Sequence, residues 1–207
     1  YKHEMNDDSI LAIERDGIRV LMVCDGVSST PRGGWVADLV SHYVRYLLQK
    51  EGKIERDSFV ELLVYIDWVS RRLGRGQAAC TVSIVYLEGR SGWVASIGDS
   101  PVLLGSRRNF EEQNLRWIVK PEEGSGLKDF VGMGQKLVEH VFFQELEVQK
   151  GDWLLVMSDG ISEAISAEEF AHYYDRRKEQ TVAKELCLLA KKNGSLDDLS
   201  VVATPIE

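Results

Sequence analysis

Three aspartates of this sequence stand at the ends of apolar runs that have the length of β-strands, and each has a glycine beside it. The runs with their closing motifs are Ile18–Cys24 before Asp25-Gly26, Gly92–Ile97 before Gly98-Asp99-Ser100, and Trp153–Met157 before Ser158-Asp159-Gly160. Runs that are apolar along nearly their whole length are typical of strands buried on both faces. If these strands share one core, their carboxylates converge, and oxygen ligands of this kind suit a hard divalent cation such as Mg²⁺. The plainer interpretation is turn chemistry, because Asp and Gly both favour turns.

The rest of the chain predicts the elements that would position these carboxylates. Asp16-Gly17 is a hairpin signal, Asp57 or Ser58 can cap a helix, and Ser166 with Glu169 forms a capping box. The expected strands cover residues 10–14, 18–24, 79–87, 92–97, 102–104, 115–119, 139–148, 153–157 and 199–203, and the expected helices cover residues 35–48, 58–73, 166–174 and 182–190. This order indicates an α+β fold, a four-layer αββα sandwich of two mainly antiparallel sheets flanked by helices.

Size and composition narrow the function classes. At 207 residues, with 44% hydrophobic and 28% charged residues, the chain is expected to form one ordinary globular domain. Its net charge of −8 argues against nucleic-acid binding, which needs a basic surface. No apolar stretch approaches the roughly 20 residues that span a bilayer, and no signal segment opens the chain, so we expect no membrane association.

The three cysteines, Cys24, Cys80 and Cys187, lie in apolar runs without metal-ligand spacing. They are expected to be small core residues in a reducing, cytoplasmic setting. Cys24 beside Asp25 is an alternative nucleophile, but no His-bearing motif lies near it in the sequence.

Taken together, the aspartate motifs resemble those of the metal-dependent protein phosphatases of type 2C. That family carries, in this order, a strand followed by Asp-Gly, then Gly-Asp-Ser, Ser-Asp-Gly and a closing Asp-Asn-hydrophobic-Ser/Thr-Val. The matching positions are Asp25-Gly26, Gly98-Asp99-Ser100, Ser158-Asp159-Gly160 and Asp197-Asp198-Leu199-Ser200-Val201, with further likeness at Asn6-Asp7-Asp8 and Gly151-Asp152-Trp153-Leu154-Leu155. The resemblance covers essentially the whole chain.

The resemblance implies a role for each matching residue. Two Mn²⁺ or Mg²⁺ ions, with a weaker third, would be held in one site. Asp25 would bridge the two metals and share the catalytic role with Asp8, which would order a metal-bound water. The other implied ligands are the Gly26 carbonyl and Asp7 at the second metal, Asp159 and Asp197 at the first, and Asp99 at the third.

The activity implied is metal-dependent hydrolysis of phosphoserine or phosphothreonine in proteins, through a water activated by two metals. The expected partners are a phosphorylated protein and a cognate Ser/Thr kinase. Two other hypotheses stay open: a catalytically weak or inactive module of the same fold that senses or binds a partner, and a metal phosphoesterase that acts on a small phosphorylated molecule.

The sequence also departs from the family pattern. The family usually has a phosphate-clamping Arg where His3 stands, a His that follows Asp-Gly in many animal members where Val27 stands, and an Arg where Pro101 stands. Arg32 is the nearest arginine to Asp25-Gly26 in sequence, so it either replaces part of the clamp or is a solvated loop residue. Residues 119–131 leave little room for a flap subdomain, so residues 1–207 are expected to form a single catalytic domain with a much reduced flap.

Overall fold

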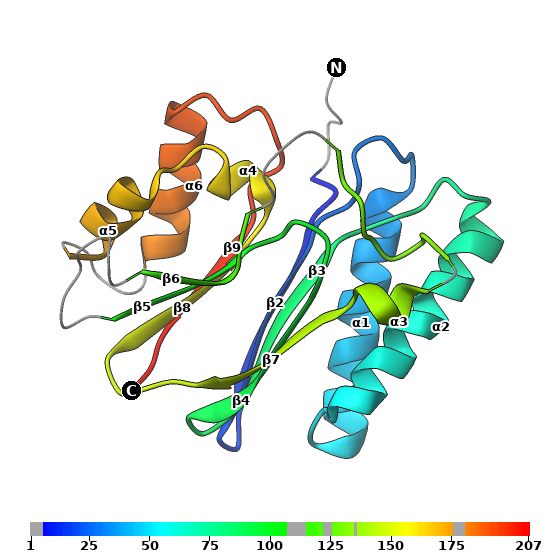
Figure 1. Ribbon diagram of the computed structural model, residues 1–207, viewed down its shortest axis with the longest axis horizontal. Helices are drawn as coiled ribbons and strands as arrows, with labels where there is room; N and C mark the ends of the chain where they lie inside the picture. The colour runs from blue at the N-terminus through cyan, green and yellow to red at the C-terminus, as the bar shows by residue number, and fades with distance from the viewer. Residues whose placement is uncertain (1–5, 107–114, 122–125, 135, 176–180) are drawn as a thin grey trace.

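Two antiparallel sheets lie face to face in a computed structural model that describes residues 6–106, 115–121, 126–134, 136–175 and 181–207 (Figure 1). Within these ranges, five strands pair in the order β1-β2-β3-β4-β7 and four in the order β6-β5-β8-β9. The first sheet consists of β1 (Ser9–Arg15), β2 (Ile18–Cys24), β3 (Val82–Glu88), β4 (Ser91–Ile97) and β7 (Phe142–Glu147). The second consists of β5 (Val102–Ser106), β6 (Arg116–Val119), β8 (Asp152–Met157) and β9 (Val201–Pro205).

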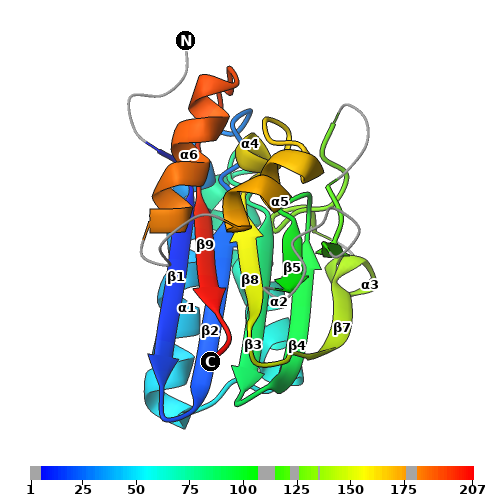
Figure 2. The same cartoon turned by 90° about the vertical axis from the view of Figure 1, so that its left-hand side faces the viewer.

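Helices cover the outer face of each sheet, as Figures 1 and 2 show. The helices are α1 (Gly33–Glu51), α2 (Arg56–Gly74), α3 (Leu137–His140), α4 (Asp159–Ser162), α5 (Ala167–Asp175) and α6 (Val182–Lys192). The pair α1 and α2 packs on the five-stranded sheet, and α5 and α6 pack on the four-stranded sheet. The predicted αββα order of layers is therefore confirmed. In the part of the chain that the structure describes, no helix is long and apolar enough to cross a membrane.

The position of β2 between two apolar clusters explains why its sequence is apolar along nearly its whole length. Val20 and Met22 lie in the apolar cluster that the five-stranded sheet shares with α1 and α2. Leu21 and Val23 lie in a second cluster between the two sheets. Because successive strand side chains point to opposite faces, both sets are buried at once. Burial of each such side chain contributes roughly 1.5–3 kcal/mol, which anchors the strand that ends at Asp25.

The register of the strands brings the predicted site motifs to one end of the sandwich. Cys24, the last residue of β2, pairs with Ser9 at the start of β1. In the same sheet, Ile97 at the end of β4 pairs with Val82 at the start of β3. In the second sheet, Met157 at the end of β8 pairs with Val201 at the start of β9. The loops that follow β2, β4 and β8 and the loop that precedes β9 therefore gather at the upper edge of the molecule in Figure 1.

Two local predictions were wrong. The expected strand over residues 139–148 begins with the short helix α3 and becomes a strand only at Phe142. Lys136, in a left-handed conformation, precedes α3, so the chain turns before it enters β7. The cap expected at Asp57 or Ser58 is also absent there, because α2 begins earlier, at Arg56, with Glu55 at its N-cap position.

Candidate functional site

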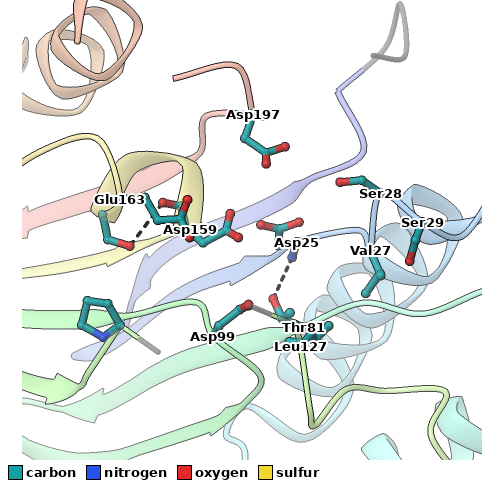
Figure 3. A pocket seen from close by; sticks show the side chains of 13 residues that line it. Asp25, Val27, Ser28, Ser29, Thr81, Asp99, Leu127, Asp159, Glu163 and Asp197 are labelled. Carbon is teal, nitrogen blue, oxygen red and sulfur yellow. Dashed lines mark hydrogen bonds between the residues drawn. The ribbon is translucent and has the colours of Figure 1, made fainter. Parts of the chain in front are cut away.

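A cavity of about 320 Å³ opens at the edge of the sandwich where these loops meet. Figure 3 shows Asp25, Asp99, Asp159 and Asp197 around it, from four different loops or helix ends. The remaining lining residues are Val27, Ser28, Ser29, Thr81, Pro121, Gly126, Leu127, Ser162 and Glu163. Four of the six predicted aspartates thus face one polar space, although they are spread over more than 170 positions of the sequence.

A pair of buried hydroxyl groups holds two of the aspartate loops together. The Thr81 hydroxyl accepts a bond from the Asp25 backbone N–H at 3.4 Å, and the Thr81 N–H donates to the Asp25 carbonyl at 2.8 Å. The same hydroxyl lies 2.6 Å from that of Ser100, which follows Asp99. Because buried hydrogen bonds of this kind restrict the backbone, Thr81 keeps the loop after β2 in a set position relative to the loop after β4.

Asp7 lies against a surface that lacks side chains. A Cβ atom at Gly34 would stand 2.6 Å from the Asp7 Oδ1 atom, and a Cβ atom at Gly26 would stand 2.5 Å from the Asp7 carbonyl oxygen. Only glycine leaves room for such an approach. The Asp7 N–H also donates to the Oδ2 atom of Asp198 at 2.8 Å. These contacts place the Asp7 carboxylate beside the first turn of α1, next to the loop of Asp25 and Gly26.

Asp8 carries two buried oxygen atoms. Neither Oδ1 nor Oδ2 has the geometry of a hydrogen bond with any described residue, although the side chains of Ser200 and Asp25 interact with the carboxyl group and lower its pKa. Burial is the largest cause that raises the pKa of Asp8 to about 6, and the negative charges of Asp198 and Asp159 add to it. Burial likewise raises the pKa of Asp25 far above its ordinary range, with the charges of Asp8 and Asp159 contributing next. The protein thus concentrates negative charge where solvent cannot offset it.

The loops after β8 and before β9 meet by close packing. A Cβ atom at Gly160 would stand 2.4 Å from the Asp198 carbonyl oxygen and 2.9 Å from the Asp197 Cβ atom. The Ser200 N–H donates to the Ser158 hydroxyl at 3.0 Å, and the Ser158 N–H donates to the Ser200 carbonyl at 2.9 Å. Asp159 at the start of α4 and Asp197 are thereby brought to the same side of the cavity.

The donor set fits a hard divalent cation by its chemistry. Among the described residues, all the charged side chains that line the cavity are carboxylates, and the charge of the buried Asp8 acts on Asp25. A cation would neutralise the repulsion among these groups, which adds to burial in raising the pKa of Asp8 and Asp25. As they stand, no group of three or more His, Cys, Asp or Glu side chains within the described residues has the spacing that would hold a metal ion.

The two residues considered for phosphate binding have different outcomes. His3 lies outside the described residues. The guanidinium of Arg32 donates from Nη1 to the carbonyl oxygen of Leu73 at 2.9 Å, at the C-terminal end of α2. Arg32 is not among the residues that line the cavity. In this position its side chain satisfies one of the last carbonyls of α2, which is a common role for arginine at a helix end.

The three cysteines are free, and Cys24 and Cys80 are buried. Burial raises the pKa of the Cys24 thiol well above its ordinary value, with the nearby aspartates contributing. Since the thiolate is the nucleophilic form of cysteine, this environment argues against a catalytic Cys24.

Sequence reasoning missed a buried aspartate that shapes one wall of the cavity. Asp67 of α2 is 3% exposed, and its Oδ1 atom accepts the N–H groups of Gly132 and Gly134 at 2.8 and 3.0 Å. Its Oδ2 atom accepts the Arg71 Nε–H at 3.0 Å. The segment of residues 126–134, which begins at the cavity, is therefore tied to α2. A weak signal was present, because Asp67 follows Leu63 by four residues and so lies at the edge of the apolar face of the predicted helix.

Comparisons with known proteins agree with this architecture. The family described as Protein phosphatase 2C matches residues 1–193. No curated protein matches the sequence. Many solved structures match the fold.

Three of these structures illustrate the likeness. PppA, a regulatory component of T6SS in Pseudomonas aeruginosa, has a TM-score of 0.79 and 20% identity over 98% of this chain and 94% of that one. The serine/threonine phosphatase Stp1 from Staphylococcus aureus has a TM-score of 0.84 and 15% identity over 100% and 91% of the two chains. RsbX, solved in complex with magnesium, has a TM-score of 0.71 and 14% identity over 100% and 91%. At these identities the structures establish the fold.

Proposed function

The chain belongs to the protein phosphatase 2C family of metal-dependent serine/threonine phosphatases, and we propose that it hydrolyses phosphoserine or phosphothreonine in a protein substrate. The observation that carries the proposal is the convergence of Asp25, Asp99, Asp159 and Asp197 on one cavity, with the buried Asp8 next to it. Cys24, the alternative nucleophile that the sequence offered, is buried as a neutral thiol, which argues against a catalytic role for it.

The proposed ligands follow from the positions of the carboxylates. Asp25, with the Gly26 carbonyl, would hold two ions, and Asp159 and Asp197 would serve the first of them. Asp7 would serve the second from its place beside Gly34, and Asp99 would serve a weaker third. When bound, Mg²⁺ or Mn²⁺ supplies Lewis acidity toward the phosphate and lowers the pKa of water.

The protein's own residues have three proposed tasks. Asp8, whose charge acts on Asp25, would orient the attacking water when the metals are bound. Thr81 and Ser100 hold the Asp25 and Asp99 loops in register. Ser28, Ser29 and Leu127 form the wall opposite Asp159 and Glu163, and this wall would contact the substrate on either side of its phosphate. The whole chain would then act as one catalytic domain, in which residues 126–134 stand in for a flap.

A second candidate is a module of the same fold that binds a partner without catalysis. The observation that favours it is that the described carboxylates lack ligating spacing as they stand. The first proposal implies a phosphoprotein substrate and a cognate kinase. It also implies a reducing, cytoplasmic setting, which suits the three free cysteines.

The test is hydrolysis of p-nitrophenyl phosphate and of a phosphothreonine peptide with and without Mn²⁺. We expect turnover that needs the metal and that is lost in Asp25→Ala and in Asp159→Ala, each with its circular dichroism spectrum unchanged. Removal of one ligand from such a site costs several kcal/mol of transition-state stabilisation. A folded Asp25→Ala protein with wild-type activity would exclude the proposal. A nucleotide or sugar phosphate as substrate tests whether the enzyme instead prefers small molecules.

A further inference from the structure

Four exposed arginines lie at the start of α1 and the end of α2. These arginines, which we call the arginine face, are Arg32, Arg71, Arg72 and Arg75. Arg32 joins the two helix ends, because its side chain donates to Leu73 at 2.9 Å and its backbone N–H donates to Gln77 at 3.1 Å. Figure 1 shows this end of the helix pair at the same edge of the molecule as the aspartate loops.

The arginine face is continuous with the wall of the cavity. Ser28 and Ser29 line the cavity, and Arg32 follows three residues later in the same loop. Three residues span at most about 10 Å of chain, even when fully extended. The loop is held on both sides, by the bond from the Val27 N–H to the Ala79 carbonyl at 3.0 Å and by the Arg32–Gln77 bond. An extended peptide with its phosphate in the cavity would therefore reach the arginines within about three to six residues.

Within the described residues, one arginine of this face has a carboxylate partner. Arg71 forms an ion pair with the buried Asp67 at 3.0 Å. Arg32, Arg72 and Arg75 form no ion pair with any described carboxylate. Arg72 lies 5.9 Å from the ring centre of Trp68, a side chain that is itself 52% exposed.

The dipole of α2 can neutralise only part of the positive charge on the arginine face. The C-terminal end of α2 carries the equivalent of about half a negative charge, and its effect fades within a turn. Four arginines exceed what this end can neutralise. The chain as a whole carries a net charge of −8, and the opposite rim of the cavity carries Asp159, Glu163 and Asp197. The cavity wall is therefore acidic on the side of α4, whereas the exposed arginines lie outside the cavity, beyond Ser28 and Ser29.

We propose that the arginine face binds an acidic segment of the phosphoprotein substrate and so sets the direction in which the substrate crosses the cavity. The inference rests on the proposed phosphatase function and names a substrate class for it. An acidic segment on the α4 side would meet like charges, whereas on the α2 side it would meet guanidinium groups that pair with carboxylates in a forked geometry. Such complementarity also steers the encounter of the two molecules and excludes the reverse orientation.

The experiment uses two pairs of phosphothreonine peptides. Within a pair, the residues about three to six positions from the phosphothreonine are acidic in one peptide and glutamine in the other. These residues lie on the N-terminal side in the first pair and on the C-terminal side in the second. Wild type is compared with Arg72→Glu/Arg75→Glu and with the milder Arg72→Gln/Arg75→Gln. The control variant is Arg45→Glu/Arg90→Glu, which makes the same change of charge at exposed positions on the middle of α1 and on the β3–β4 turn.

We expect wild type to prefer one acidic peptide through a lower KM. The Arg72→Glu/Arg75→Glu variant should reduce that preference roughly three- to tenfold, the size expected for two exposed ion pairs, with kcat unchanged. Hydrolysis of p-nitrophenyl phosphate should be the same in all variants. The preference should also fall as salt rises to about 0.5 M, because exposed charges are screened.

Failure of this inference differs from failure of the proposed function. If both peptides and p-nitrophenyl phosphate are hydrolysed with no preference in wild type, or if the control variant loses as much preference as Arg72→Glu/Arg75→Glu, the arginine face does not bind substrate. If no substrate is hydrolysed, the phosphatase proposal fails. Fluorescence polarisation of the labelled acidic peptide then still decides the inference: binding that the double variant weakens supports it, and equal or absent binding overturns it.

Discussion

Replacement of Asp8 by asparagine should stabilise the metal-free protein at neutral pH while it removes the catalytic role that we propose for this residue. Both carboxylate oxygens of Asp8 are buried, and neither has the geometry of a hydrogen bond with any described residue. Burial, with the charges of Asp198 and Asp159, raises its pKa from 3.8 to about 6. A shift of this size corresponds to roughly 3 kcal/mol between the protonated and ionised forms. Asparagine keeps the shape of the side chain and removes the charge.

The sign of the effect depends on pH. Since the pKa of Asp8 is higher in the folded than in the unfolded state, its contribution to stability is fully present below about pH 3.8 and is lost as the pH rises through about 6. The metal-free wild type therefore loses up to roughly 3 kcal/mol through this group by pH 7.5, and Asp8→Asn does not. An unpaired buried amide costs about 1–3 kcal/mol at either pH, so the difference between the two pH values isolates the charge.

The assay is thermal unfolding in a chelator at pH 4.5 and 7.5. Because about 1 kcal/mol of this stability is already lost at pH 4.5, roughly 2 kcal/mol separates the two pH values. For a domain of this length about 1 kcal/mol corresponds to 2–4 °C in Tm, so Tm of the variant relative to wild type should rise by up to roughly 4–8 °C between them. Asp38→Asn, at an exposed position of α1, is the control and should show little change. An Asp8→Asn difference that is equal at both pH values would refute the claim that ionised Asp8 opposes folding.

Three further outcomes follow from the same site. Millimolar Mn²⁺ should raise the Tm of wild type, since a ligand at about 100 times its Kd adds roughly 2.7 kcal/mol to the free energy of unfolding, and an unchanged Tm would count against a clustered site. Gly34→Ala should reduce that Mn²⁺-dependent rise without loss of the fold, because the new Cβ atom would stand 2.6 Å from the Asp7 Oδ1 atom, and calorimetric Mn²⁺ titration checks it. Gly52→Ala is the control: its left-handed backbone should lower Tm, but its Cβ atom meets no atoms, so the Mn²⁺-dependent rise should stay unchanged. If Arg32 contacts phosphate, Arg32→Ala should raise KM for a phosphopeptide roughly ten- to a hundredfold, and His3→Arg should lower KM. If Arg32 instead serves only its bond to Leu73, Arg32→Ala should change KM less and should lower Tm.

Sequence periodicity predicted the scaffold well because local chemistry and tertiary packing agree along most of the chain. The capping box at Ser166 and Glu169 is present, with the Ser166 N–H bonded to the Glu169 carboxylate at 2.9 Å and the Glu169 N–H bonded to the Ser166 hydroxyl at 3.2 Å. Gly52 ends α1 in the left-handed conformation, as its position predicted. Such signals depend on a few neighbouring residues, so a single sequence contains them in full.

The positions of the loops depended on contacts that no local pattern encodes. Asp67 binds the N–H groups of Gly132 and Gly134, which follow it by more than sixty residues. Thr81 joins loops that belong to two different strand pairs. A threonine before a strand and an aspartate within a helix each have ordinary local roles, so the pairing became visible only in three dimensions. Residue types and spacing therefore predicted which carboxylates gather, and the buried polar contacts determine how they are held.

The buried carboxylates destabilise the metal-free fold, and this bears on whether the protein is a catalyst or a non-catalytic module. Burial and mutual repulsion raise the pKa of both Asp8 and Asp25, so their ionised forms oppose folding at neutral pH. Substitution of either by a neutral residue would relieve that penalty, and a module that only binds a partner through its surface loses nothing by such a change. A protein that binds divalent cations recovers the penalty through the binding free energy of the metal. Retention of these acids together with Asp159 and Asp197 is therefore what a cation-dependent function requires, and it is the physical reason to prefer the phosphatase over the inactive module.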